Sequence, residues 1–598
     1  MDTGTKLIVM AFISVSILLP RQVDAAQPFL DNAPTLLDLA ETKLAPLTEA
    51  ERKMFKAAAK GEISDCSGPK KDNDPANAAD WPKARSIRAD CIEWLCRKPQ
   101  VALVSYEGVL IRGVRIDGEL NLKFFNIPFP LIIMECSILS GIDLRHAEIR
   151  MLSLYGTHTG RIKADGLKVE GDVLLRKVKA VGGVHLVGAT ITGQLACRGG
   201  EFISSQDTDG IALNVNSLKI TRSVFFDQGF RVKGRVDLSN AIIGGQLNCS
   251  SGKFIDFNGV ALDGDGLTVG ANVLLNKGFK AEGEVNLRGA VIEGQLSCTN
   301  GKFIHPNGNA LSCDSVKVKK SVLLYKGFKA DGIVRLVKAE IDGVFQWLAE
   351  DSPGKITLYL QSAVIGTLWD NKESWPRKGK LFLNGFKYDE IGDNSPTDSK
   401  SRIEWIRRQY DPHIKKDSQF RPQPYEQLAS VLRKMGKDAD AKKVLITKNK
   451  DRAKWGPKLA LSEWFWYRVF GPMIGYGHSP WRAFLIGLAI IVFGTFLFRI
   501  GFKNDLMVDT KDSENASSVK FQALVYSIDM FVPLVDLYQA KYWLPDPVQQ
   551  GEWRPFNLSW FKVPVSGSSL RRYLWFHIIA GWILTTLLVV GLTGLIRT

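Results

Sequence analysis

An internal repeat of 49 residues constrains the fold of this chain more than any other feature of its sequence. Three segments align without gaps: GFRVKGRVDLSNAIIGGQLNC begins at Gly229, GFKAEGEVNLRGAVIEGQLSC at Gly278 and GFKADGIVRLVKAEIDGVFQW at Gly327. A more divergent copy, VKAVGGVHLVGATITGQLAC, ends at Cys197. A fixed period of this length indicates one structural unit that stacks on copies of itself, as in a solenoid.

Apolar and polar residues alternate within each copy, as in Val285-x-Leu287. Alternation over two to four residues is typical of short strands with one buried face. Glycines such as Gly283, Gly289 and Gly294 separate these strands and mark corners of the backbone. The density of glycine and β-branched residues disfavours a helical repeat. We therefore predict a mainly β fold centred on a right-handed parallel β-helix.

The patterned region extends from about Gly108 to about Phe386, and we assign residues 105–392 to the β-helix. With about 22 residues in each coil and about 4.8 Å between stacked strands, roughly 12 to 13 turns form a rod about 60 Å long. Such a rod is suited to serve as a spacer or a platform.

Cysteines recur at one position of the repeat, at Cys197, Cys249 and Cys298, and Trp347 takes this position in the next copy. Turns two apart are too distant for a disulfide, and no histidine accompanies these cysteines as a metal ligand. We interpret them as small hydrophobic residues of the core. The sequence has no Cys-x-x-Cys pair, which argues against zinc-ribbon and thioredoxin-like sites. One disulfide could form in an oxidising compartment among Cys66, Cys91 and Cys96.

The segment 26–104 precedes the repeats and is helical in pattern. Leu47–Ser64 and Pro82–Lys98 are the predicted helices, and Thr48 followed by Glu51 is a capping-box pattern. A β-helix exposes its first turn as an unpaired edge, so a cap at this end blocks end-to-end association.

Residues 393–460 follow the repeats. Within them Tyr425–Leu445 predicts two helices joined at Gly436, and the pattern resembles a single tetratricopeptide-type hairpin. One copy cannot form a superhelix, so we expect it to pack on its neighbours. The basic stretch that ends at Lys458 could contact anionic lipid or a partner, or it could be a solvated helix face.

The N-terminus resembles a secretory signal. Lys6 precedes an apolar run, Leu7–Leu19, and small residues follow at Val23-Asp24-Ala25. We predict a signal peptide over residues 1–25 with cleavage after Ala25. The alternative is an uncleaved anchor, although the run is shorter than the ~20 residues that a spanning helix needs.

The segment 461–598 contains two apolar stretches. Ala483–Phe498 carries no charge and is flanked by arginines, and Tyr573–Ile596 is uncharged throughout. We therefore predict two membrane-spanning helices, near 481–500 and 573–596.

The charges around these helices predict their orientation. The stretch between them is rich in lysine and arginine, whereas only Arg597 follows the second helix. By the positive-inside rule this stretch is cytoplasmic, which places the repeat domain in the periplasm and the protein in the bacterial inner membrane. The basic run Lys442–Lys458 argues for the opposite orientation, but it lies farther from the first helix.

Between the two apolar stretches lies a semi-apolar segment, Phe521–Leu537. The order of these elements, and the likeness of Ala523–Asp529 to a pore helix, resemble a degenerate two-helix ion-channel pore domain. A potassium filter needs a Thr-x-Gly-Tyr-Gly run. An interfacial helix that only packs is the alternative interpretation. The pore-like segment that stands in place of the filter consists of Val532, Pro533, Leu534, Val535 and Asp536.

The repeated G-x-V-x-L…G-x-I-x-G-Q-L-x-C block and the upstream RADCIEWLC (Arg88–Cys96) resemble a family of bacterial pentapeptide-like repeat proteins. The SPWRA motif (Ser479–Ala483) fits the same group. Some members are labelled membrane-associated oxidoreductases. The resemblance implies a β-helix and membrane attachment, and it brings the oxidoreductase label as an alternative. The chain has no Gly-x-Gly-x-x-Gly after a strand and no haem-type Cys-x-x-Cys-His.

We therefore predict a non-enzymatic, membrane-anchored scaffold or binding protein of the bacterial cell envelope, with no catalytic, cofactor-binding or metal-binding residues. Its expected partners are the bilayer and another protein or an envelope polymer, not nucleic acid, and an oligomer is possible. The formal charge of +16 suits an anionic partner without identifying it. Alternatives are a channel-like subunit, an oxidoreductase, or a polysaccharide-active β-helix. The last would use carboxylates available along the rod, namely Asp117, Asp165, Glu284 and Asp342.

Overall fold

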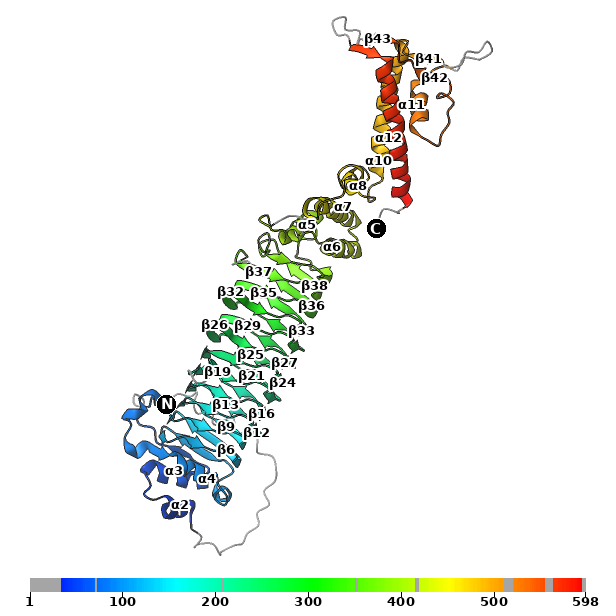
Figure 1. Ribbon diagram of the computed structural model, residues 1–598. Coiled ribbons are helices and arrows are strands. Elements are labelled where there is room, and N and C mark those ends of the chain that lie inside the picture. The colour runs from blue at the N-terminus through cyan, green and yellow to red at the C-terminus, as the bar shows by residue number, and fades with distance from the viewer. Residues whose placement is uncertain are drawn as a thin grey trace, which may run out of the picture.

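The chain folds into a long rod with helices at both ends, and a pair of long helices lies beyond its C-terminal end (Figure 1). The computed structural model describes residues 34–69, 73–205, 209–349, 353–414, 419–509, 520–553 and 563–593. The signal peptide predicted for residues 1–25 lies outside this part of the chain.

Each turn of the rod contains short strands separated by corners. One turn holds β10 (His158–Thr159), β11 (Ile162–Lys163), β12 (Lys168–Val169) and β13 (Val173–Leu174). In the next turn β14 (Lys179–Val181) pairs with β10 in parallel. This stacking produces a 21-stranded sheet, here sheet A, and a 19-stranded sheet, here sheet B, through about 12 turns. The prediction of a mainly β fold built on a parallel β-helix is confirmed.

The sequence repeat corresponds to two turns of the rod. In sheet A, Thr268 pairs with Val291, and Val291 pairs with Lys317. Two successive turns therefore span the 49-residue period. The longer turn of each pair contains one of the long strands, β26 (Lys253–Asp263) or β32 (Lys302–Ser312), whose register with its neighbour shifts midway.

Glycines allow the close approach of neighbouring turns. Gly283 has φ 123°, and a Cβ at this position would lie 2.3 Å from the carbonyl oxygen of Asp256. Gly294 is equally crowded, because its Cβ would lie 2.4 Å from Oδ1 of Asn272. No side chain fits at these two positions, which explains the glycines of the repeat.

A row of phenylalanine rings fills one side of the core. The rings of successive turns lie 5.2 to 5.8 Å apart between centroids, and all are buried. Aromatic pairs at such distances contribute about 0.5–1.5 kcal/mol beyond the burial of their area. The row contains Phe230, Phe254, Phe279, Phe303 and Phe328.

The repeated cysteines lie in the core as predicted. Cys197, Cys249 and Cys298 are fully buried. The prediction of a disulfide among Cys66, Cys91 and Cys96 is wrong, because all eight cysteines are free thiols in the structure. Nearness in sequence did not bring two of these sulfur atoms together: Cys91 lies in the helix Ala89–Leu95 and Cys96 directly follows it, whereas Cys66 follows the strand Ile63–Asp65.

Thiol reagents are expected to modify at most Cys66 rapidly in the native protein. Cys66 is half-buried and the other cysteines are buried. Burial raises the pKa of the Cys96 and Cys136 thiols to about 12, so the reactive thiolate is scarce at neutral pH. The measurement is titration with an aromatic disulfide reagent before and after denaturation. Two or more fast thiols in the native state would contradict this packing.

The N-terminal cap contains α2 (Leu36–Leu44) and α3 (Glu49–Lys60). The capping box of Thr48 and Glu51 is present as predicted. The Glu51 carboxylate is fully buried, and its Oε1 accepts hydrogen bonds from the backbone N and Nε of Arg88, both at 2.9 Å. This contact attaches the cap to the rod.

The rod begins inside the segment that the sequence assigns to the cap. β1 (Ile63–Asp65) pairs with β3 (Val109–Arg112), and β2 (Ser86–Arg88) pairs with β4 (Arg115–Asp117). The helix predicted over Pro82–Lys98 is therefore wrong at its start: Lys83–Arg85 forms a short 3-10 turn, and the α-helix α4 is confined to Ala89–Leu95. Residues 86–88 form a strand because their backbone groups pair with the otherwise unpaired edge of the rod.

At the other end, α5 (Ser399–Ile406), α6 (Gln423–Lys434) and α7 (Asp438–Trp455) cover the last turns. The predicted hairpin is confirmed, and its two helices α6 and α7 are joined at Gly436.

A buried ion pair closes the core beneath these helices. Asp370 pairs in register with Trp347 of the preceding turn, so a carboxylate occupies a core position that is apolar in earlier turns. Arg402 of α5 contacts both of its oxygens, at 2.7 and 2.9 Å, and the indole Nε1 of Trp375 donates to Oδ2 at 2.8 Å. The core therefore ends in a hydrogen-bonded polar cluster.

Within the described residues, two helices are long and apolar enough to cross a membrane, α10 (Trp481–Lys503) and α12 (Gly567–Thr593), with mean hydropathies of 2.4 and 1.9. They lie side by side with α11 (Ala523–Phe531) against them (Figure 1). α12 begins six residues before the predicted start at Tyr573. The residues at 594–596, predicted as its end, lie outside the described part of the chain. α10 follows a short helical connection, α8 (Leu461–Phe465) to α9 (Gly471–Met473).

Candidate binding surface

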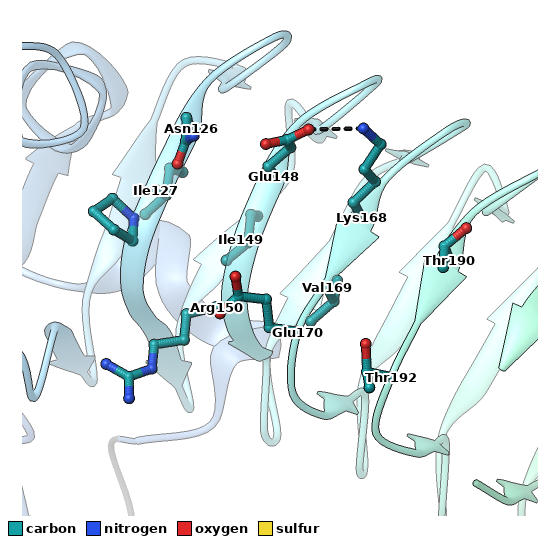
Figure 2. A pocket seen from close by; sticks show the side chains of 11 residues that line it. Asn126, Ile127, Glu148, Ile149, Arg150, Lys168, Val169, Glu170, Thr190 and Thr192 are labelled. Atoms are coloured by element: carbon teal, nitrogen blue, oxygen red, sulfur yellow. Dashed lines mark hydrogen bonds and ion pairs between the residues drawn. The ribbon is translucent and has the colours of Figure 1, made fainter. Parts of the chain in front are cut away.

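A hollow of about 500 Å³ lies on the outer face of sheet A near the N-terminal end of the rod (Figure 2). It crosses four successive turns, through β6 (Asn126–Met134), β9 (Glu148–Ser153), β12 and β16 (Thr190–Ile191). Alternate residues of these strands are buried, such as Ile149 and Val169, which leaves their neighbours outside. The face of the hollow is therefore polar because of the strand period.

Charges of both signs line this hollow. The Glu148 carboxylate and the Lys168 amine point toward one another, 2.8 Å apart, as Figure 2 shows. Arg150 and Glu170 occupy the next outward positions, and Thr190 adds a hydroxyl group. These groups can hydrogen-bond a polar chain that lies across the turns.

A second hollow, of about 330 Å³, lies near the C-terminal end of the rod. Its lining comes from residues 306–308 of β32, from β35 (Lys329–Arg335), β37 (Ile356–Tyr359) and β39 (Leu381–Phe382), and from two lysines. We call it the C-terminal hollow.

Stacked aromatic rings form one side of the C-terminal hollow. The rings of Tyr359 and Phe382 are nearly parallel, with centroids 4.2 Å apart. The Arg335 guanidinium lies 5.4 Å from the Tyr359 ring. Lys355 and Lys380 also line the hollow, and the Lys355 amine pairs with Asp331. In the strand register Tyr359 lies between Arg335 and Phe382, so both faces of its ring are covered.

The four carboxylates considered for sugar hydrolysis do not come together. They lie on different turns of the rod, and each already interacts with a neighbour. The pairs are Asp117 with Arg115, Asp165 with the backbone N of Val187, Glu284 with Asn309, and Asp342 with Lys319. These interactions are those of solvated surface residues in a β-helix.

The pore-like segment directly follows α11. The Asp529 carboxylate accepts hydrogen bonds from the backbone N–H groups of Leu537 and Ala540, both at 2.7 Å. These bonds hold the loop that contains 532–536 against the end of α11. Leu534 at its tip is 84% exposed, and Asp536 forms an ion pair with Lys541. The resemblance to a channel pore stays a prediction.

A buried histidine, which we had not singled out from the sequence, connects α12 to α11. His577 Nε2 lies 2.9 Å from the carbonyl oxygen of Ser527, and Nδ1 lies 3.3 Å from the Tyr573 hydroxyl. A Cβ on Gly494 of α10 would lie 2.6 Å from this imidazole. The three helices therefore pack around a satisfied polar group, as buried polar groups require.

Neither hollow was predicted from the sequence. Their outward residues are polar and alternate with core residues, a pattern that solvated faces share. Among the residues that the structure describes, no three His, Cys, Asp or Glu side chains are grouped to hold a metal ion. Comparisons with protein-family models, curated proteins and solved structures found no match for this chain.

Proposed function

We propose that this protein is a membrane-anchored scaffold of the bacterial cell envelope, whose rod presents an elongated binding surface to another protein or to an envelope polymer. The observation that carries the proposal is the rod of about 12 turns joined through α5 to α7 to two helices apolar enough to span a bilayer. Solenoids use such extended surfaces to bind partners.

The repeating geometry of the rod supports a binding role. Parallel strands in register place outward side chains in straight rows, about 4.8 Å apart from turn to turn. Rigid rows of this kind match a partner that is itself extended and repetitive. The two hollows add hydrogen-bonding groups and stacked rings at separate points along the surface.

The anchor assigns the rod to one side of the membrane. α10 and α12 span the inner membrane, and the basic stretch between them faces the cytoplasm by the positive-inside rule. The rod, which precedes α10, therefore lies in the periplasm. The basic helix α7 sits between the rod and the bilayer, where it can meet anionic headgroups.

Labelling of single introduced cysteines tests this arrangement. Asn307→Cys lies at an exposed position of β32, and Val548→Cys lies between α10 and α12 at a residue that is 81% exposed. In spheroplasts, a membrane-impermeant maleimide is expected to label the first variant and to label the second only after lysis.

The unsubstituted protein is the control for labelling of its own cysteines, of which Cys66 is half-buried and the other seven are buried. Extraction at alkaline pH should leave the protein in the membrane pellet. Labelling of both positions from the same side, or release of the protein by the alkaline wash, would overturn the proposed anchor and with it the envelope scaffold.

A further inference from the structure

Five consecutive turns place a cation at the same outward position of sheet B. The strands β22 (Arg231–Lys233), β26, β29 (Lys280–Asn286), β32 and β35 pair through these residues. Four of the side chains are exposed and one, Lys280, is half-buried. We call this set the cationic row: Arg231, Lys253, Lys280, Lys302 and Lys329.

The cationic row is unfavourable for the isolated rod. Like charges directly opposite one another on paired strands destabilise a sheet. Arg231, Lys253 and Lys302 form no ion pair or hydrogen bond through their side chains with any residue in the described part of the chain. The neighbouring outward positions add Lys233 and three carboxylates: Glu201, which stands opposite Arg231 and pairs with Lys179, Glu282, which pairs with Lys280, and Asp331.

Asp331 pairs with Lys355. In the equivalent outward row of sheet A, by contrast, carboxylates on adjacent strands neutralise the charge of lysines. There Lys168 pairs with Glu148, and Lys317 pairs with Glu340 on the adjacent strand. The positive charge of sheet B is therefore a feature of one face and not of the whole rod.

The C-terminal hollow shares the strand β35 with the cationic row but is not in line with it. Gly332 and Ile333, which line the hollow, lie in the same strand as Lys329. In the strand register Tyr359 lies opposite Arg335 and Phe382, and Arg335 is six residues along β35 from Lys329. The hollow therefore lies to one side of the line that the row follows along the rod.

We propose that the cationic row binds a linear acidic polysaccharide that runs along the rod. The inference rests on the proposed scaffold function and names its ligand class. An extended chain of 1,4-linked sugars advances by nearly one strand spacing per residue, so the carboxylates that face the rod can meet cations of the row at several turns.

The test uses full-length protein in detergent and polygalacturonate, a 1,4-linked polyuronate, as the probe. The row variant carries Lys253→Gln, Lys280→Gln and Lys302→Gln. The matched control carries Lys219→Gln, Lys317→Gln and Lys387→Gln, which removes the same charge from the same kind of position in sheet A. Affinity is measured by fluorescence anisotropy at several salt concentrations.

We expect the row variant to bind at least about tenfold more weakly and the control within about twofold of the unsubstituted protein. The dependence of affinity on salt should also be shallower for the row variant, because fewer ions are released on binding. The melting temperature of the row variant should not fall, because the substitution relieves repulsion.

Equal weakening in the row and control variants would show general charge attraction and overturn the site. Tighter binding of a single-stranded oligonucleotide of equal charge would overturn the ligand class. Absence of polygalacturonate binding by the unsubstituted protein would overturn the inference, while the cysteine-labelling result would still decide the membrane-anchored scaffold separately.

Discussion

Replacing Arg402 by methionine is expected to lower the free energy of unfolding of the rod by about 3–5 kcal/mol. The Arg402 side chain has 0% exposure, and it contacts both oxygens of an equally buried carboxylate on Asp370. Removal of the guanidinium leaves a negative charge without its counter-ion at the end of the core. The measurement is a urea titration followed by the fluorescence of the nearby tryptophans.

A double replacement separates the loss of the pair from a packing effect. In Arg402→Met with Asp370→Asn no charge is left unpaired, so part of the stability should return. The surface pair of Lys319 and Asp342 is the control, because both side chains are 60% exposed. Lys319→Met should change stability by less than about 0.5 kcal/mol. Equal effects of Arg402→Met and Lys319→Met would contradict the proposed role of the buried pair.

Phe279→Ala is expected to cost about 3–5 kcal/mol, through lost burial and the cavity that it leaves. The Phe279 ring lies between those of Phe254 and Phe303, at 5.2 and 5.4 Å. Because each turn contacts mainly its neighbours, amide exchange should accelerate most in β29 and the adjacent strands.

Phe279→Leu is the matched control for the row of rings. It keeps most of the apolar volume, so its cost should stay below about 1.5 kcal/mol if the site repacks. A loss of less than about 1 kcal/mol for Phe279→Ala would mean that the turns do not share a packed aromatic core. Uniform acceleration of exchange along the whole rod would mean that the turns unfold as one cooperative unit.

The repeat was enough to predict the architecture of the rod. Apolar residues recur at the same inward positions in every copy, and stacking of the turns buries all of them in one continuous core. The ends of the rod were harder to predict. Ser86–Arg88 forms a strand of only three residues that lies outside the repeat and pairs only with a strand of the next turn. The absence of the predicted disulfide has a similar cause, since spacing along the chain does not define the distance between two sulfur atoms.

The candidate site could be predicted only in part. Residues that meet in the two hollows are one or more turns apart in sequence, and polar outward positions look alike whether they face solvent or a ligand. The cationic row did leave a signal, since Arg231, Lys280 and Lys329 take the same place in three copies. The sequence alone did not show that each copy makes two turns. In the structure the second turn of each copy places Lys253 and Lys302 between the three repeated cations.

Because one repeat makes two turns, the number of repeats sets the length of the rod. Loss or gain of one 49-residue unit changes its length by about 10 Å and leaves both end caps and both sheets in their original phase. A change in the number of repeats therefore alters the distance from the N-terminal hollow to α10 and α12 without changing any contact at either end of the rod.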